Sequence, residues 1–271
     1  MTFLNTLVMK CKFESKWAVL LCALMLCAVR PAAAQSYSDA FYDALNADDL
    51  ALQRSILSEW QQAVPDDVDL RIARFNYHLN QCLMSGNDRI QADSAIRTID
   101  TAIMHNPDRL DLRFGKIYFL GQIAQWERYA DEILNTLNRS ESTGHRWQFP
   151  NLPDAGRDLM LEGVQDYLAT LRQELSENTT PADSHSVLLL RRIAHRAAQV
   201  FPGNAAILLY LADSYMMLGD HEGALRYLLR AEKVAYNAPA VLSRIVEAYT
   251  KTGQRKLAAQ YRGRLQAATA D

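Results

Sequence analysis

The residues that could do chemistry in this chain are its six histidines, at positions 78, 105, 145, 185, 195 and 221. No two of them form an HExxH pair or another metal-ligand spacing. His185 and His195 are ten residues apart on one expected helix and do not share a face closely. The sequence also lacks a glycine-rich phosphate loop, a GxSxG turn and a catalytic pair of carboxylates. We therefore expect a protein that is not an enzyme and holds no metal or cofactor.

The cysteines offer one further candidate for chemistry. Cys11, Cys22 and Cys27 lie in the N-terminal segment, so Cys82 is the one cysteine in the remainder of the chain. Cys82 shares an expected helix-packing row with Phe75 and Leu79. A free cysteine in such a row behaves as a small hydrophobic residue. We expect Cys82 to be buried; the alternative is a catalytic thiol.

Residues 1–34 have the pattern of a signal peptide. Lysines at 10, 12 and 16 precede the apolar run 17–29, and residues 32–34 are all alanine. This apolar run is short for a membrane span but suits the centre of a secretory signal. We expect an exported bacterial protein, periplasmic or secreted, that starts at Gln35 and is not inserted in the membrane. A retained anchor is the alternative, and translation could start at Met1 or Met9.

Composition indicates a globular protein without a basic surplus. Of the 271 residues, 49% are hydrophobic and 22% are charged, with a net charge of -2. Residues 1–34 hold four basic residues and one acidic residue, so 35–271 holds 25 basic and 30 acidic residues. Nucleic-acid binding by bulk positive charge is therefore not expected.

Charge is spread unevenly along 35–271. Residues 35–70 contain eight acidic side chains and one basic side chain, whereas 185–271 contains twelve basic and six acidic ones. Solvated outer faces explain this pattern. The alternative is a dipolar molecule that attracts acidic partners at its C-terminal end or stacks head to tail. The oligomeric state is left open.

One pattern of residues occurs twice near the C-terminus, at a constant spacing. Residues 208, 211, 215, 219 and 224 (Leu, Leu, Tyr, Gly, Ala) are matched by residues 242, 245, 249, 253 and 258 (Leu, Ile, Tyr, Gly, Ala). This spacing resembles the tetratricopeptide repeat (TPR), in which small residues let two helices approach closely and large ones fill the space between them. The strongest matches are 205–238 and 239–271.

The resemblance implies an all-α fold for 35–271. We expect a right-handed superhelical solenoid of about six antiparallel helix pairs, with the first helix of each pair lining a concave groove. Earlier units are weaker. One is expected from residues 114, 117, 118 and 121 followed by 130, 134 and 137, and the unit that contains Gly86 fits only with four residues inserted around 87–90. The last helix departs from the pattern at Arg262 and Leu265, as a terminal cap should.

Relatives of this kind imply a non-enzymatic scaffold that binds a protein or peptide in the cell envelope. The expected groove positions, which should be partly exposed, are Asn76, Asn80, Phe119, Gln122, Asp213, Met216, Met217 and Glu247. Asn76 and Asn80 lack groove lysines beside them, so the carboxylate clamp of chaperone-binding TPR proteins is incomplete. The alternative is a structural or assembly subunit that docks through its convex face or through an irregular loop.

That irregular loop is expected at 138–156, which is rich in serine, glycine, proline and asparagine. It carries Trp147 and Phe149, which either form a binding lid beside the groove or fill the gap where two repeats diverge. Loops of this length are often functional, so both residues are candidate partner-binding residues.

Overall fold

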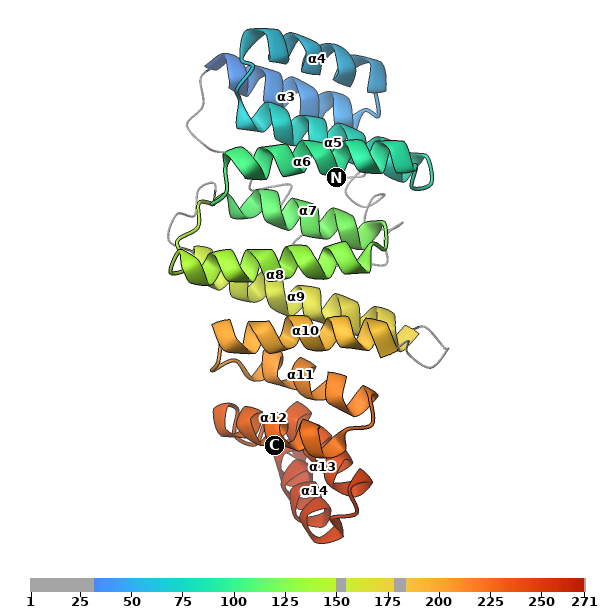
Figure 1. Ribbon diagram of the computed structural model, residues 1–271, viewed down its shortest axis with the longest axis vertical. Helices are drawn as coiled ribbons and strands as arrows, with labels where there is room; N and C mark the ends of the chain where they lie inside the picture. The colour runs from blue at the N-terminus through green and yellow to red at the C-terminus, as the bar shows by residue number, and fades with distance from the viewer. Residues whose placement is uncertain (1–31, 150–154, 178–183, 271) are drawn as a thin grey trace. The chain divides into compact units, whose positions relative to one another are not determined.

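The computed structural model describes residues 32–149, 155–177 and 184–270 (Figure 1). The expected leader therefore lies outside the described residues up to position 31. Within these ranges the chain forms twelve α-helices and one isolated parallel β-bridge, between Arg109 and Gln148. The all-α prediction is confirmed. The helices are α3 Ala32–Asn46, α4 Leu50–Ala63, α5 Val68–Met84, α6 Arg89–His105, α7 Leu110–Gln122, α8 Trp126–Ser142, α9 Gly156–Glu177, α10 Ser184–Val200, α11 Ala205–Met217, α12 His221–Val234, α13 Pro239–Lys251 and α14 Arg255–Ala270.

The chain divides into two compact units. Among the described residues, unit 1 comprises 32–125, 145–149 and 155–157, and unit 2 comprises 126–144, 158–177 and 184–270. In unit 1, α3 packs on α4 and α5, and α6 packs on α5 and α7 (Figure 1). In unit 2, α10 packs on α8 and α11, and α12 packs on α11 and α13, with α14 against α13.

The core of unit 1 forms where helices with apolar faces meet. Phe41, Trp60 and Leu70, from α3, α4 and α5, are completely buried. The indole Nε1 of Trp60 donates to Asp67 Oδ2 over 3.0 Å, so its polar atom is satisfied. Asp67 also accepts from the backbone N–H of Asp69 and thereby caps α5. One carboxylate thus starts a helix and anchors the largest core side chain.

The last two helix pairs repeat in structure as well as in sequence. The rings of Tyr215 and Tyr227 lie 5.3 Å apart at 37°, and those of Tyr249 and Tyr261 lie 5.6 Å apart at 38°. The first contact joins α11 to α12 and the second joins α13 to α14, at equivalent positions of the two repeats. The two contacts therefore lie 34 residues apart, at the spacing of the repeat in the sequence.

The small residues and glycines of these repeats do what their positions predict. Ala212, Ala224 and Ala231 are completely buried, so α11 and α12 can approach closely. Gly219 and Gly253 have φ values of +79° and +73°, in the region that glycine adopts without steric cost. In α14 the one buried residue is Ala258.

The turns in the earlier units differ from those of the last two repeats. Gly121 lies inside α7, and the left-handed turn conformation is taken by Ala124, with φ +54°. The turn between α5 and α6 covers 85–88, one residue longer than the turns 218–220 and 252–254. Helix α6 begins six residues before the buried Ala95, whereas α12 begins three residues before the buried Ala224. The four inserted residues are therefore present, one in the turn and three at the start of α6. An extra residue is accommodated because Gly86 and Asn87 both adopt positive φ.

The predicted loop at 138–156 is longer than the connection between helices that the structure shows. Helix α8 continues to Ser142, and α9 begins at Gly156. The preference for caps and turns over a helix is only weak for Asn138, Ser140 and Ser142. Residues 138–143 contain no proline or glycine that would interrupt the helix. Gly144 and His145 then adopt positive φ, at +62° and +61°, and end the helical path.

Candidate partner-binding surface

A charged cluster joins the first helices of unit 2. Asp213 on α11 is 7% exposed and accepts hydrogen bonds from two arginines. Arg172 Nε on α9 lies 2.5 Å from Asp213 Oδ2, and Arg244 Nε on α13 lies 2.9 Å from Asp213 Oδ1. The carboxylate therefore places α9, α11 and α13 side by side. We call the surface that these three helices share the first-helix face.

Both arginines remain charged and accessible in this cluster. Their side chains are 36% and 31% exposed, for Arg172 and Arg244 respectively. The hydrogen bond to Asp213 raises the pKa of Arg244 above its usual value, against the opposing effect of burial, and Glu247 adds to the rise. Arg244 therefore carries its charge at every physiological pH.

Aromatic and acidic side chains lie next to this cluster. Burial raises the pKa of Tyr210 on α11, whose charged neighbours are Arg172, Asp166 and Asp213. Burial, with a smaller effect of Glu162, raises the pKa of Asp166 on α9 to about 6. The hydroxyl of Tyr129 on α8 donates to the backbone oxygen of Tyr167 over 3.1 Å and holds α8 against α9.

The predicted groove residues of α11 and α13 have different environments. Met217 is 37% exposed, Met216 is half-buried and Glu247 is exposed. These three reach the surface, as expected. The prediction of partial exposure was wrong for Asp213, because the arginines on both neighbouring helices cover its side chain.

Sequence reasoning missed the two arginines. Arg244 lies outside the inner positions that the repeat pattern assigns, and Arg172 belongs to a long helix without a repeat register. A usable signal was present in Asp213 itself. It is the one charged residue in α11, AAILLYLADSYMM, and a carboxylate buried in an apolar helix requires a partner.

The candidates in unit 1 lie mainly in the core. Phe119 is completely buried, with its ring 5.8 Å from that of Phe75, and Asn80 is 8% exposed. Asn76 is half-buried and donates to the hydroxyl of Tyr42 over 3.1 Å. Gln122 is half-buried at the end of α7. Phe119 and Asn80 therefore pack inside unit 1 and present little surface to a partner.

Trp147 and Phe149 are packed rather than displayed. They are 4% and 5% exposed. The backbone of Gln148 bonds to Leu110 N and Asp108 O, over 3.0 and 2.8 Å, and so fixes the segment to the start of α7. Phe149 lies 6.5 Å from the ring of Phe114, and the guanidinium of Arg113 lies 5.8 Å from the ring of Trp147. This packing favours the gap-filling interpretation over the lid.

Gly156 permits the close approach of the two ends of this loop. A Cβ atom at position 156 would lie 2.7 Å from Trp147 Cβ and 3.3 Å from its backbone nitrogen. Any larger residue would therefore push the segment away from the start of α9. Gly156, which was predicted to be a loop residue, therefore has a packing role.

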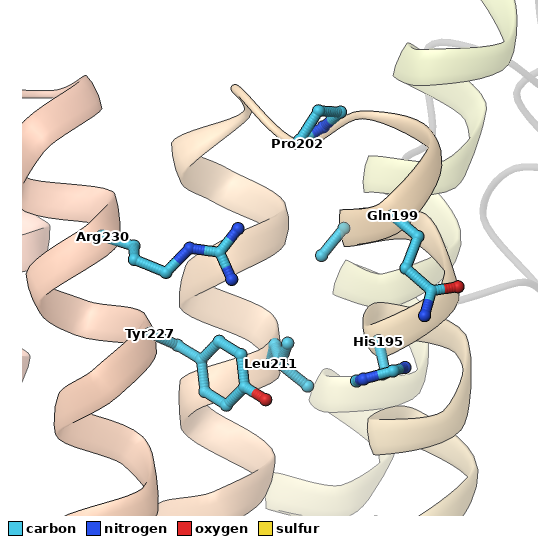
Figure 2. A pocket seen from close by; sticks show the side chains of 7 residues that line it. His195, Gln199, Pro202, Leu211, Tyr227 and Arg230 are labelled. Carbon is cyan, nitrogen blue, oxygen red and sulfur yellow. The ribbon is translucent and has the colours of Figure 1, made fainter.

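An accessible hollow lies between the second helices α10 and α12 of unit 2, over Leu211 of α11. Figure 2 shows His195 and Gln199 of α10 facing Tyr227 and Arg230 of α12, with Leu211 of α11 between them. The hollow has a volume of about 370 Å³ and is also lined by Ala198 and Pro202. Both polar and apolar side chains line it. No pattern in the sequence indicated this hollow.

Metal-binding clusters and membrane-spanning helices are both absent from the described ranges. Residues 32–149, 155–177 and 184–270 contain no group of three or more histidine, cysteine or acidic side chains that could hold a metal ion. None of the helices in the same ranges is both long and apolar enough to cross a bilayer. Cys82 is completely buried, as predicted, and burial, followed by the nearby Asp88, raises the pKa of its thiol.

Comparisons with solved structures find similar helical proteins at low sequence identity. PilW, described as a widely conserved type IV pilus biogenesis factor, is 12% identical over 88% of this chain and 94% of its own, with a TM-score of 0.41. The pilF protein of Pseudomonas aeruginosa is 11% identical over 87% and 91%, with a TM-score of 0.39. The TPR domain of P58(IPK) is 15% identical over 82% and 66%, with a TM-score of 0.30.

No family model matches the chain, and a search among curated proteins finds no match either. The helix pairs themselves carry the structural description. Their repeat period, glycine turns, buried alanines and repeated tyrosine contacts are those of TPR-like helix pairs. The chain is an all-α protein built from TPR-like helix pairs, most regular over 205–270.

Proposed function

We propose that this chain is a non-enzymatic scaffold that binds a protein or peptide segment on the first-helix face of unit 2. One observation carries the proposal: the contacts of Asp213 with Arg172 and Arg244 join three first helices into one surface. That surface presents charged groups and the exposed Met217 together. Methionine is flexible and polarisable, so it suits contact with varied apolar side chains.

The location that we propose is the cell envelope. Its support is the sequence of residues 1–34, in which lysines, an apolar run and three alanines follow one another in signal-peptide order. Cleavage after Ala34 would remove the first three residues of α3 and leave the buried Phe41 in place. N-terminal sequencing of the protein from its host should find Gln35 first. A protein that retains Trp17 would contradict cleavage.

A photo-cross-linking amino acid at position 217 tests the binding surface. In cells, Met217 should yield a cross-linked partner, whereas the same group at His195, exposed on α10, should not. The Arg244→Gln variant should reduce the cross-link from position 217. Cross-links from position 195 alone would contradict the proposal.

That opposite outcome would favour a second function. A structural subunit of an envelope complex could dock through the second helices, and the hollow lined by His195, Tyr227 and Arg230 is the observation that supports it (Figure 2). Absence of cross-links from both positions would contradict both functions.

A further inference from the structure

We propose that Arg172 and Arg244 together bind an aspartate or glutamate side chain that lies within the partner segment. This inference rests on the proposed function and names the chemistry of its ligand. The two guanidinium groups meet at one buried carboxylate, and both remain about one-third exposed. They therefore form a fixed cationic site on the first-helix face.

Asp213 positions the two arginines through their inner nitrogens. Arg172 and Arg244 each use Nε, and Arg244 adds a longer contact of 3.5 Å from Nη2 to Asp213 Oδ2. Among the residues that the structure describes, Arg172 has no further hydrogen bond from its Nη atoms, and Arg244 has none from Nη1. A guanidinium offers five donors in a planar fork, so donors remain for a second carboxylate.

The charge balance also favours an anion. One buried carboxylate needs one guanidinium for neutrality, and Asp213 has two. If the cluster served only to hold α9, α11 and α13 together, an uncharged donor in place of one arginine would suffice. The second positive charge, which Glu247 offsets without forming an ion pair, can therefore pair directly with a carboxylate from outside that binds between the arginines.

Acidic neighbours set the limits of this site. Glu247 is exposed on α13 and lies one turn after Arg244, and in the described ranges it forms no ion pair with that arginine. It reduces the local positive potential and should therefore weaken the binding of an acidic ligand. On the α9 side, the charge of Asp166 raises the pKa of Tyr210 and so lowers the positive potential there as well. The predicted site is thus selective for a carboxylate that reaches the arginines directly.

The rest of the surface indicates which residues accompany the acidic one. Tyr210 lies beside Arg172, and Met216 follows Asp213 by three residues on α11. Both are half-buried, so they offer partly apolar surface next to the cations. We expect an acidic side chain within a chain segment and next to apolar residues, rather than a run of charges.

Single substitutions can remove the surplus charge without unpairing Asp213. Arg172→Gln leaves Arg244 bonded to the carboxylate, and Arg244→Gln leaves Arg172, so each variant keeps a neutral buried pair. Arg230→Gln is the matched control, because it removes an exposed arginine of α12 that does not contact Asp213. Thermal unfolding followed by circular dichroism verifies that all three remain folded.

The experiment selects nine-residue random peptides, displayed on phage without a free C-terminus, against the purified chain. Selected peptides should be enriched in aspartate or glutamate next to an apolar residue. A selected peptide, synthesised with blocked ends, should bind about 10-fold or more weakly to Arg172→Gln and to Arg244→Gln, and equally well to Arg230→Gln. Replacing its acidic residue with the amide should cause the same loss. Glu247→Gln should bind it more tightly.

Failure of this inference can be separated from failure of the proposed function. Enriched peptides without an acidic preference, or with affinities that both arginine variants leave unchanged, would overturn the carboxylate site and leave peptide binding intact. Weaker binding to Glu247→Gln would contradict the electrostatic basis. Enrichment of no peptide sequence at all would overturn both proposals.

Discussion

Asp213 accepts a hydrogen bond from Arg244 across 2.9 Å, and this contact joins the first helices of two successive repeats. The carboxylate is 7% exposed, while Arg244 remains accessible. A buried acidic side chain thus supports an exposed basic one. The arrangement separates the residue that stabilises the surface from the residues that can bind a ligand.

Asp213→Ala should destabilise unit 2 by about 1–3 kcal/mol. Removing one member of a buried ion pair costs more than that at fully enclosed sites, but here both arginines can turn toward water. Chemical denaturation monitored by circular dichroism measures the free energy of unfolding. Asp213→Asn keeps an acceptor oxygen, so its free energy of unfolding should decrease less than that of Asp213→Ala. Equal stability of Asp213→Ala and the wild type would show that the ion pairs add nothing.

Two glycine substitutions should change stability in opposite directions. Gly219 has φ +79° with no atom within 4 Å of an added Cβ. Gly219→Ala should therefore destabilise the protein by the backbone strain alone, about 1 kcal/mol. Gly263 is exposed within helix α14 and also has open space around it, so Gly263→Ala should stabilise by about 0.5–1 kcal/mol. Melting temperatures of the two variants test this contrast. Changes of the same sign would contradict it.

The acidic side chain of Asp166 predicts a pH dependence of stability. Burial raises its folded-state pKa from 3.8 to about 6, so the unfolded chain releases this proton more readily than the folded one. Its contribution to stability should therefore decrease as pH rises from about 4 to about 6, by about 1–2 kcal/mol, because the half-buried carboxyl is partly screened by water. Above that window Asp166→Asn should be more stable than the wild type.

Denaturation of both proteins between pH 4 and pH 8 measures this difference. The difference should be smallest near pH 4, because Asp166 is then protonated in the folded state and about half protonated in the unfolded state. Glu162→Gln should reduce the effect, since Glu162 contributes to the raised pKa. A stability difference that does not change with pH would show that Asp166 is not held in a desolvated site.

Cys82→Ala should cost about 1 kcal/mol through a small cavity and leave partner binding unchanged. The thiol is completely buried in α5, and its raised pKa keeps it protonated at neutral pH. Thiol-reactive dyes should modify the folded protein far more slowly than the unfolded protein. Rapid labelling in the folded state, or a loss of binding without a loss of stability, would favour a reactive thiol.

Local spacing by itself determined most of the last four helices. The repeat period predicted α11 to α14, the glycine turns at 219 and 253 and the buried alanines, because these features depend on residues close in sequence. Where the spacing was weak, no glycine marked the turn between α7 and α8, and the structure places its left-handed residue at Ala124. A residue with a side chain can adopt the left-handed conformation when packing on both sides requires it.

Only the tertiary structure decided which side chains form the candidate surface. The sequence marked Asp213, but its partners Arg172 and Arg244 lie 41 and 31 residues away, and helix packing alone brings them together. The same holds for Trp147 and Phe149, which composition presents as loop residues and which α7 buries. Repeat periodicity specifies contacts between neighbouring helices in a pair, whereas ion pairs and loop packing depend on distances that no local pattern contains.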